Sequence, residues 1–269
     1  MNTTLHIVSK IGDVNYVKDI LEKQPSLISC HNSEGETPVY VAAREGHFDV
    51  LQIMFDHLKR NKENIESLLI RPEDKHNALH IAIQNHHAPV VFFLLKEVPQ
   101  LANHENVLKE SPLYLAAERG YFEIVKLILN KSKGKSFTGP NGKTALHAAA
   151  ISNSAECVKY LLHGRLDLLI QKDENNWTPL RYAVHYNSLL AMKELLHVNH
   201  SIGYELVTQG DTIISLLHIA ASRGHCETMK VLMSICPGSS DLTDTKGRNI
   251  LHVAIESNQN EVIELNISR

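Results

Sequence analysis

The stretch Thr144-Ala-Leu-His-Ala-Ala-Ala150 decides the fold, because related stretches recur along the whole chain. Eight copies start at Thr3, Thr37, Asn77, Ser111, Thr144, Thr178, Ser215 and Asn249. The successive starts are separated by 34, 40, 34, 33, 34, 37 and 34 residues. Self-similarity at a nearly fixed period of this length is typical of stacked repeat proteins. We therefore expect residues 1–269 to form one domain of about eight repeats.

Each copy predicts two helices joined by a sharp turn. The starting Thr, Ser or Asn can accept a hydrogen bond from the first turn of a helix. Nine residues later comes a residue type that favours a left-handed helix end. These residues are Gly12, Gly46, His86, Gly120, Asn153, Asn187, Gly224 and Asn258. A second apolar stretch such as 122–129 follows, with an apolar face that one repeat cannot bury alone. The predicted fold class is all-α, a solenoid of helix-turn-helix units.

Three segments depart from the regular period. The 40-residue spacing contains the polar stretch 59–66, which we expect to lengthen a second helix or its loop. The 37-residue spacing contains residues 197–209, and neither segment has the composition of a linker between domains. The eighth copy ends within its second helix, so we interpret the last repeat as truncated and the chain as a fragment or the product of a shortened gene.

Composition argues against several functional classes. The formal net charge is -3, which gives no electrostatic basis for nucleic-acid binding. The sequence begins without a signal peptide and contains no apolar run long enough to span a bilayer. The four cysteines lack metal-ligand spacing, so we expect reduced thiols and a cytoplasmic location.

A histidine recurs at the fourth motif position in five copies: His6, His80, His147, His218 and His252. We interpret it as structural, hydrogen-bonded to backbone groups of the adjoining turn. A metal ligand would not be replaced by Tyr40, Tyr114 and Arg181 in the other copies. The segment 139–144 superficially resembles a phosphate loop, but Phe137 stands where that motif needs glycine. We expect no cofactor, no metal and no enzymatic activity, although a catalytic group assembled in space stays open at this point.

Residues 144–149 and 216–221 resemble the Thr-Pro-Leu-His signature of ankyrin repeats, and the resemblance covers essentially the whole chain. Residues 36–46, 139–144, 177–183 and 246–252 further resemble the plant ankyrin family with a Pro-Gly-Gly segment, which includes the Accelerated Cell Death proteins. The resemblance implies a protein-interaction scaffold or adaptor in defence or stress signalling, in the cytoplasm or at the cytoplasmic face of the plasma membrane. Its partner would be a protein, and a longer membrane-bound ankyrin relative is one candidate. Members carry membrane helices after the repeats, and this sequence stops before them. The alternative is the cytosolic ankyrin domain of a membrane-anchored receptor or channel-like protein.

The family binds partners on its concave side, through the loops between repeats (fingers) and the exposed ends of the first helices. Carried over to this sequence, these positions predict a partner-binding surface of Arg44, Glu45, Glu118, Arg119, Lys143, Ile151, Trp177, His185, Tyr186, Ile214 and Arg223. Trp177 is the only tryptophan, and aromatic residues and arginine often dominate interface energies. We hypothesise that Trp177 and Tyr186, flanked by Arg223, are the main anchor. The alternative interpretation is that Trp177 packs against its own finger.

Overall fold

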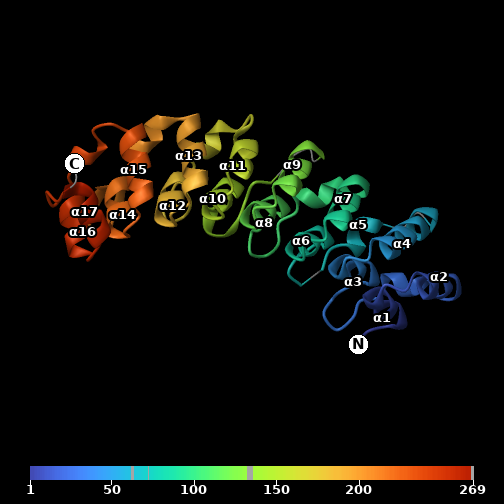
Figure 1. Ribbon diagram of the computed structural model, residues 1–269. Helices are drawn as coiled ribbons and strands as arrows, with labels where there is room; N and C mark the ends of the chain where they lie inside the picture. Colours follow the sequence, from blue (N-terminus) through green and yellow to red (C-terminus); the bar gives the residue numbers. More distant parts are fainter. Residues whose placement is uncertain (62–63, 72, 132–135, 268–269) are drawn as a thin grey trace. The chain divides into compact units, whose positions relative to one another are not determined.

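The computed structural model describes residues 1–61, 64–71, 73–131 and 136–267. It divides into two compact units, Met1–Pro140 and Asn141–Arg269. Both units are built from the same pair of helices, repeated (Figure 1).

The first unit contains α1 (Thr4–Ile11), α2 (Val14–Lys23), α3 (Pro38–Glu45), α4 (Phe48–Asn61), α5 (Ile65–Leu68), α6 (Ala78–Gln84), α7 (Ala88–Glu97), α8 (Pro112–Glu118) and α9 (Phe122–Lys131). The second contains α10 (Ala145–Ile151), α11 (Ala155–Leu162), α12 (Pro179–His185), α13 (Leu189–Val198), β1 (Leu206–Gln209), β2 (Thr212–Ser215), α14 (Leu216–Ser222), α15 (Cys226–Ile235), α16 (Ile250–Glu256) and α17 (Asn260–Ile267). Short 3-10 turns lie at Pro25–Ser29, Pro99–Asn103, Leu166–Ile170, His200–Tyr204 and Ser239–Asp241.

All eight predicted helix starts are confirmed as N-caps. Thr37 Oγ1, for example, accepts a hydrogen bond from the backbone N–H of Tyr40 at 3.1 Å. The eight predicted turn residues are confirmed too, since every one has a positive φ, between 55° and 85°. His86 is among them at 58°, and its ring stacks on Tyr121 with the centroids 4.1 Å apart.

Within each unit, first helices pack on first helices and second helices on second helices. The first unit has the rows α1–α3–α6–α8 and α2–α4–α7–α9, and the second has α10–α12–α14–α16 and α11–α13–α15–α17. Small side chains on the first helices let the backbones approach; Ala42, Ala43, Ala220 and Ala221 are completely buried. Stacking therefore buries the face that one repeat leaves open, as expected for a solenoid.

The recurring histidine ties four of the repeats to the repeat that follows. In four copies the ring Nε2 donates to the carbonyl of the residue before the next helix start. The pairs are His6 with Glu36, His80 with Glu110, His147 with Trp177, and His218 with Arg248, at 2.8–3.0 Å. The Nδ1 atom of each ring accepts the N–H of its own cap residue. The structural interpretation of these histidines is confirmed.

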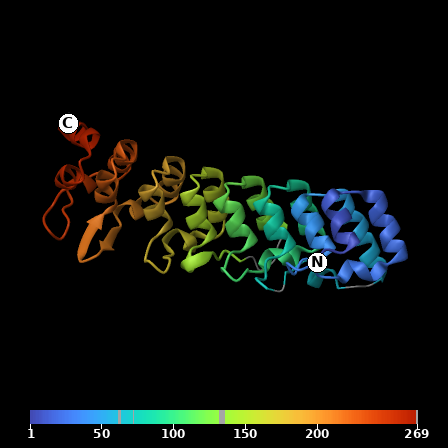
Figure 2. The same cartoon turned by 90° about the horizontal axis from the view of Figure 1, so that it is seen from below.

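The two long spacings are used differently. In the 40-residue spacing, α4 extends to 14 residues and α5 follows it, as predicted. In the 37-residue spacing, β1 and β2 form an antiparallel hairpin, with Val207 opposite Ile214 (Figure 2). This finger is therefore a short two-stranded ladder within an otherwise helical solenoid.

The expected exposure of Ile214 is wrong. Ile214 is only 8% exposed, and its partner Val207 is only 4% exposed. Successive side chains of a strand point to opposite faces, so the exposed isoleucine is the neighbouring Ile213, at 43%. The error arose because Ile214 was assigned to an exposed finger position, whereas it lies on the buried face of a strand.

None of the helices in the described part of the chain has the length and apolar run needed to span a bilayer. All four cysteines are free thiols, with Cys157 and Cys236 buried.

Candidate functional site

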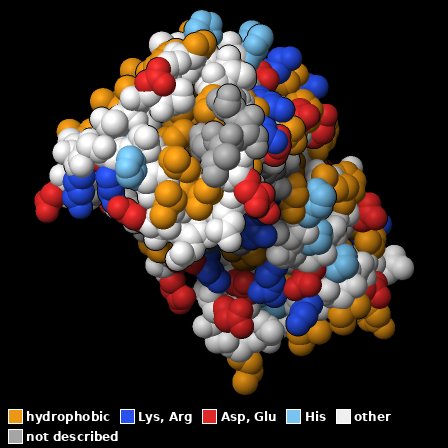
Figure 3. All heavy atoms as spheres, turned by 60° about the vertical axis from the view of Figure 1, so that its left-hand side comes forward, with side chains coloured by type: hydrophobic (Ala, Val, Ile, Leu, Met, Phe, Trp, Pro, Cys, Tyr) orange, Lys and Arg blue, Asp and Glu red, His pale blue; other side chains and the backbone are white. Residues whose placement is uncertain are grey.

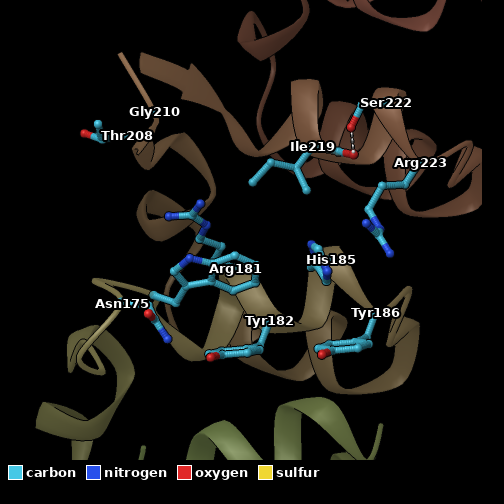
Figure 4. A pocket seen from close by; sticks show the side chains of 11 residues that line it. Asn175, Arg181, Tyr182, His185, Tyr186, Thr208, Gly210, Ile219, Ser222 and Arg223 are labelled. Carbon is cyan, nitrogen blue, oxygen red and sulfur yellow. Dashed lines mark hydrogen bonds between the residues drawn. The ribbon is translucent and has the colours of Figure 1, made fainter. Parts of the chain in front are cut away.

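A groove of about 540 Å³ opens in the second unit among α12, α14 and the β-hairpin (Figure 4). Its lining combines aromatic, cationic and small polar side chains. The lining residues are Asn175, Trp177, Arg181, Tyr182, His185, Tyr186, Thr208, Gly210, Ile219, Ser222 and Arg223.

The finger before α12 fixes the position of Trp177. The carboxylate of Asp173 accepts hydrogen bonds from the backbone N–H groups of Asn175 and Trp177, at 2.9 and 2.8 Å. Its second oxygen accepts the hydroxyl of Tyr182 at 2.6 Å, which links the finger to α12. Burial opposes ionisation of Asp173, but these hydrogen bonds outweigh it and lower the pKa of the carboxyl. Trp177 therefore stands on a finger held at both ends, because its carbonyl also accepts from His147.

The aromatic side chains form a connected cluster along α12. The ring centroid of Trp177 lies 4.8 Å from Tyr182 and 4.9 Å from His185. The ring of Tyr186 lies parallel to that of Tyr182 at 6.2 Å and edge-on to His185 at 5.0 Å. Trp177 is partly buried, whereas Tyr186 is 54% exposed. Trp177 therefore packs on its own repeat and also lines an open groove, and its role as a partner anchor stays a prediction.

Arg181 lies under this cluster and is only 4% exposed. Its guanidinium carbon is 4.2 Å from the ring centroid of Trp177, so cation and indole are stacked. Burial lowers the pKa of Arg181 against the opposing effect of Glu205 and Asp173. Among the described residues, no atom accepts a hydrogen bond from Arg181 Nε.

The opposite wall comes from α14. Figure 4 shows Arg223, at the end of α14, and His185, on α12, extending toward each other across the groove. Burial and the nearby Arg223, His225 and Arg181 lower the pKa of His185, so its imidazole is neutral at pH 7.

The predicted residues of the second unit meet this groove to different degrees. Trp177, His185, Tyr186 and Arg223 line it directly. Lys143 lies on the preceding finger, just before α10, and its ammonium is 5.6 Å from the centroid of the Tyr182 ring. Ile151 ends α10 outside the lining, and the buried Ile214 supports the hairpin from inside.

The predicted residues of the first unit lie outside the lining of this groove. Arg44 makes ion pairs with Glu34, Glu45 and the nearly buried Glu36, so its charge is already matched. Glu118 and Arg119 are exposed at the end of α8. Figure 3 shows one face of the molecule, on which basic and acidic side chains are interspersed.

Sequence reasoning missed Arg181, Tyr182 and Ile219 as groove residues. Arg181 carried a readable signal, since it stands where five copies have histidine. Tyr182 and Ile219 fall at helix positions that repeats normally bury, and the hairpin residues required the strand pairing. Across the described residues, no three His, Cys, Asp or Glu side chains are grouped to hold a metal ion.

Comparison with known proteins supports the prediction that the chain consists of ankyrin repeats. A family model described as ankyrin repeats (3 copies) matches residues 57–138, 113–208 and 199–265. Among solved structures, the ankyrin repeat domain of Bcl-3 superposes with a TM-score of 0.65 at 21% identity, covering 87% of this chain and 100% of that one. The human ASB11 ankyrin repeat domain gives 0.64 at 20% identity, covering 86% and 97%. At these identities the structures show the fold alone.

Sequence relatives are longer proteins. The Target of rapamycin complex 2 subunit AVO2 of Saccharomyces cerevisiae is 25% identical over 64% of this chain and 40% of its own length. Protein ACCELERATED CELL DEATH 6 of Arabidopsis thaliana is 26% identical over 67% of this chain and 30% of its own. The Transient receptor potential cation channel subfamily A member 1 of Drosophila melanogaster is 26% identical over 100% of this chain and 22% of its own. The chain thus matches less than half of the length of each of these relatives.

Proposed function

The chain belongs to the ankyrin-repeat family, and on that premise we propose that it is a non-enzymatic adaptor that holds a protein partner in the Trp177 groove. Ankyrin repeats are protein-interaction modules. The single observation that carries the proposal is the groove itself: a held tryptophan, two tyrosines and two arginines around one open cavity. Tryptophan, tyrosine and arginine are the residues most enriched among those that dominate binding energy.

The biological setting that we propose is plant defence or stress signalling, in the cytoplasm or at the cytoplasmic face of the plasma membrane. Its support is the 26% identity to ACCELERATED CELL DEATH 6. A second proposal is that the repeats are the cytosolic part of a membrane-anchored receptor or channel-like protein. The similarity to the Drosophila channel, which extends over 100% of this chain, favours it.

Partner capture with single-residue variants tests the adaptor proposal. Trp177→Ala should lower affinity for the captured partner by about 2 kcal/mol or more, roughly thirtyfold. Tyr16→Ala is the matched control, because Tyr16 is a 62% exposed aromatic residue on α2. If both variants retain the partner equally and both remain folded by circular dichroism, the groove is not the anchor.

A further inference from the structure

We propose that the groove recognises the carboxylate of an aspartate or glutamate side chain in a partner peptide, received by Arg181. This inference rests on the proposed function and names the chemistry of the partner. It starts from a cation that the fold buries without matching it.

The buried guanidinium has unused hydrogen-bonding capacity. Only 4% of the surface of Arg181 is exposed, yet its Nε has no hydrogen-bond acceptor among the described residues. Leaving a buried donor unpaired costs free energy, and more so when the group is charged. Because Nε itself is enclosed, a carboxylate that enters the groove would be received at the part of Arg181 that lines the cavity.

The two carboxylates that raise the pKa of Arg181, those of Glu205 and Asp173, are hydrogen-bonded to other groups. Glu205 accepts the hydroxyl of Thr178 at 2.7 Å, and burial raises its pKa. Asp173 is engaged by Tyr182 and by two backbone N–H groups of its finger. Both carboxylates attract the charge of Arg181 electrostatically, but among the described residues neither forms an ion pair with it.

The stacking geometry suits a carboxylate. The guanidinium carbon of Arg181 lies over the Trp177 ring, 4.2 Å from its centroid. An arginine held over an aromatic ring can still donate N–H bonds to a carboxylate. Because the indole is held by its finger, the guanidinium is positioned before a ligand arrives.

The rest of the lining complements an acidic peptide. Arg223 adds a second cation on the far side, beside the neutral His185, and no Asp or Glu is among the described lining residues. Ile219 and the tyrosine rings offer apolar surface beside the arginines for the residues that flank the acid. A lone buried guanidinium among rings fits one planar carboxylate better than a phosphate group, which carries more charge and more acceptors.

The experiment uses the full chain and reads emission from Trp177, the only tryptophan. Three pools of tryptophan-free, N-acetylated and C-amidated nonapeptides with random apolar flanks are titrated. Their central residue is glutamate, glutamine or phosphoserine. A fourth pool has central glutamine and a free C-terminal carboxylate. The glutamate pool should bind about tenfold to a hundredfold more tightly than the amidated glutamine pool.

Variants separate recognition from folding. Arg181→Met keeps an apolar stem against Trp177 and should abolish the preference for glutamate. Arg181→His restores the residue that five copies carry, so it should keep the fold and also lose the preference. Arg165→Met is the control, since Arg165 is exposed and paired with Asp167, away from the groove lining. It should bind like the wild type.

Each outcome decides. If the glutamate and amidated glutamine pools bind equally, and Trp177→Ala abolishes that binding, the carboxylate assignment is overturned. The groove would then bind peptides without recognising an acidic side chain. If the phosphoserine pool or the pool with a free C-terminus binds most tightly, the ligand is not the carboxylate of an aspartate or glutamate side chain, and the proposal is overturned. No binding of any pool also overturns the inference, whereas the adaptor proposal is judged independently by partner capture.

Discussion

Acid should weaken the fold through His80, one of the recurring histidines. Its side chain has no exposed surface. Nδ1 accepts the N–H of Asn77 at 3.2 Å, and Nε2 donates to the carbonyl of Glu110 at 3.0 Å. Nδ1 also lies 2.7 Å from the side-chain oxygen of Asn77. Burial of the ring away from water favours its neutral form. Burial, and then the nearby His76, lower the pKa of His80 to about 3.

The size of the effect follows from the two pKa values. The unfolded chain binds a proton at His80 near pH 6.5 and the folded chain only near pH 3. Between these values the unfolded state holds more protons, so stability rises with pH. From pH 7.5 to pH 5 the loss attributable to His80 is about 2 kcal/mol.

His80→Gln isolates this contribution. Glutamine can donate to the Glu110 carbonyl and accept from the Asn77 N–H, as in the common capping box, but it does not titrate. Urea denaturation followed by circular dichroism should show about 2 kcal/mol less loss between pH 7.5 and pH 5 in His80→Gln than in the wild type. The exposed His163, changed to glutamine, should behave as the wild type. Identical pH dependence in wild type and His80→Gln would refute the reasoning.

Three further outcomes are expected. Gly46→Ala should cost about 3 kcal/mol against about 1 kcal/mol for Gly164→Ala, measured by urea denaturation. Both glycines have a φ near 80°, but only at Gly46 would a Cβ meet the imidazole of the next repeat, at 2.5 Å; equal losses would contradict this. Trp177 emission should be quenched on acidification with a midpoint below pH 6.5, because burial and neighbouring cations lower the pKa of His185, and His185→Gln should remove the transition. Asp173→Ala should cost about 2 kcal/mol and shift Trp177 emission to longer wavelength, since the finger loses three hydrogen bonds; unchanged emission would show that the carboxylate does not hold it.

The sequence predicted the repeat because its local signals act within a few residues. A cap such as Thr37 satisfies N–H groups three residues away, and a turn residue such as Asn153 needs only its own backbone to be left-handed. Neither depends on distant contacts, so spacing alone located all eight starts and turns. The recurring histidine was assigned correctly for a related reason: one register implied one repeated hydrogen bond.

The groove could be predicted only in part. Trp177 and Tyr186 stood out by residue type and repeat position, and both line it. Ile214 was misplaced because strand pairing with Val207, not helix register, decides which side chains are exposed. Arg181 was noted only as a replacement for histidine, since its burial and its stacking on the indole depend on the three-dimensional packing of finger and helix.

Two departures from the repeat coincide at this groove, and that coincidence is the strongest argument for its role. Arg181 replaces the structural histidine, and the longer spacing after it builds the hairpin whose Thr208 and Gly210 line the same cavity. The 40-residue spacing, by contrast, lengthens α4 and adds α5, in the other unit. A change that served stacking alone would restore the hydrogen bond that histidine makes. At Arg181 the buried Nε instead has no acceptor among the described residues, and the cation faces a cavity. The stability forgone there is understandable if a carboxylate in the groove neutralises the cation.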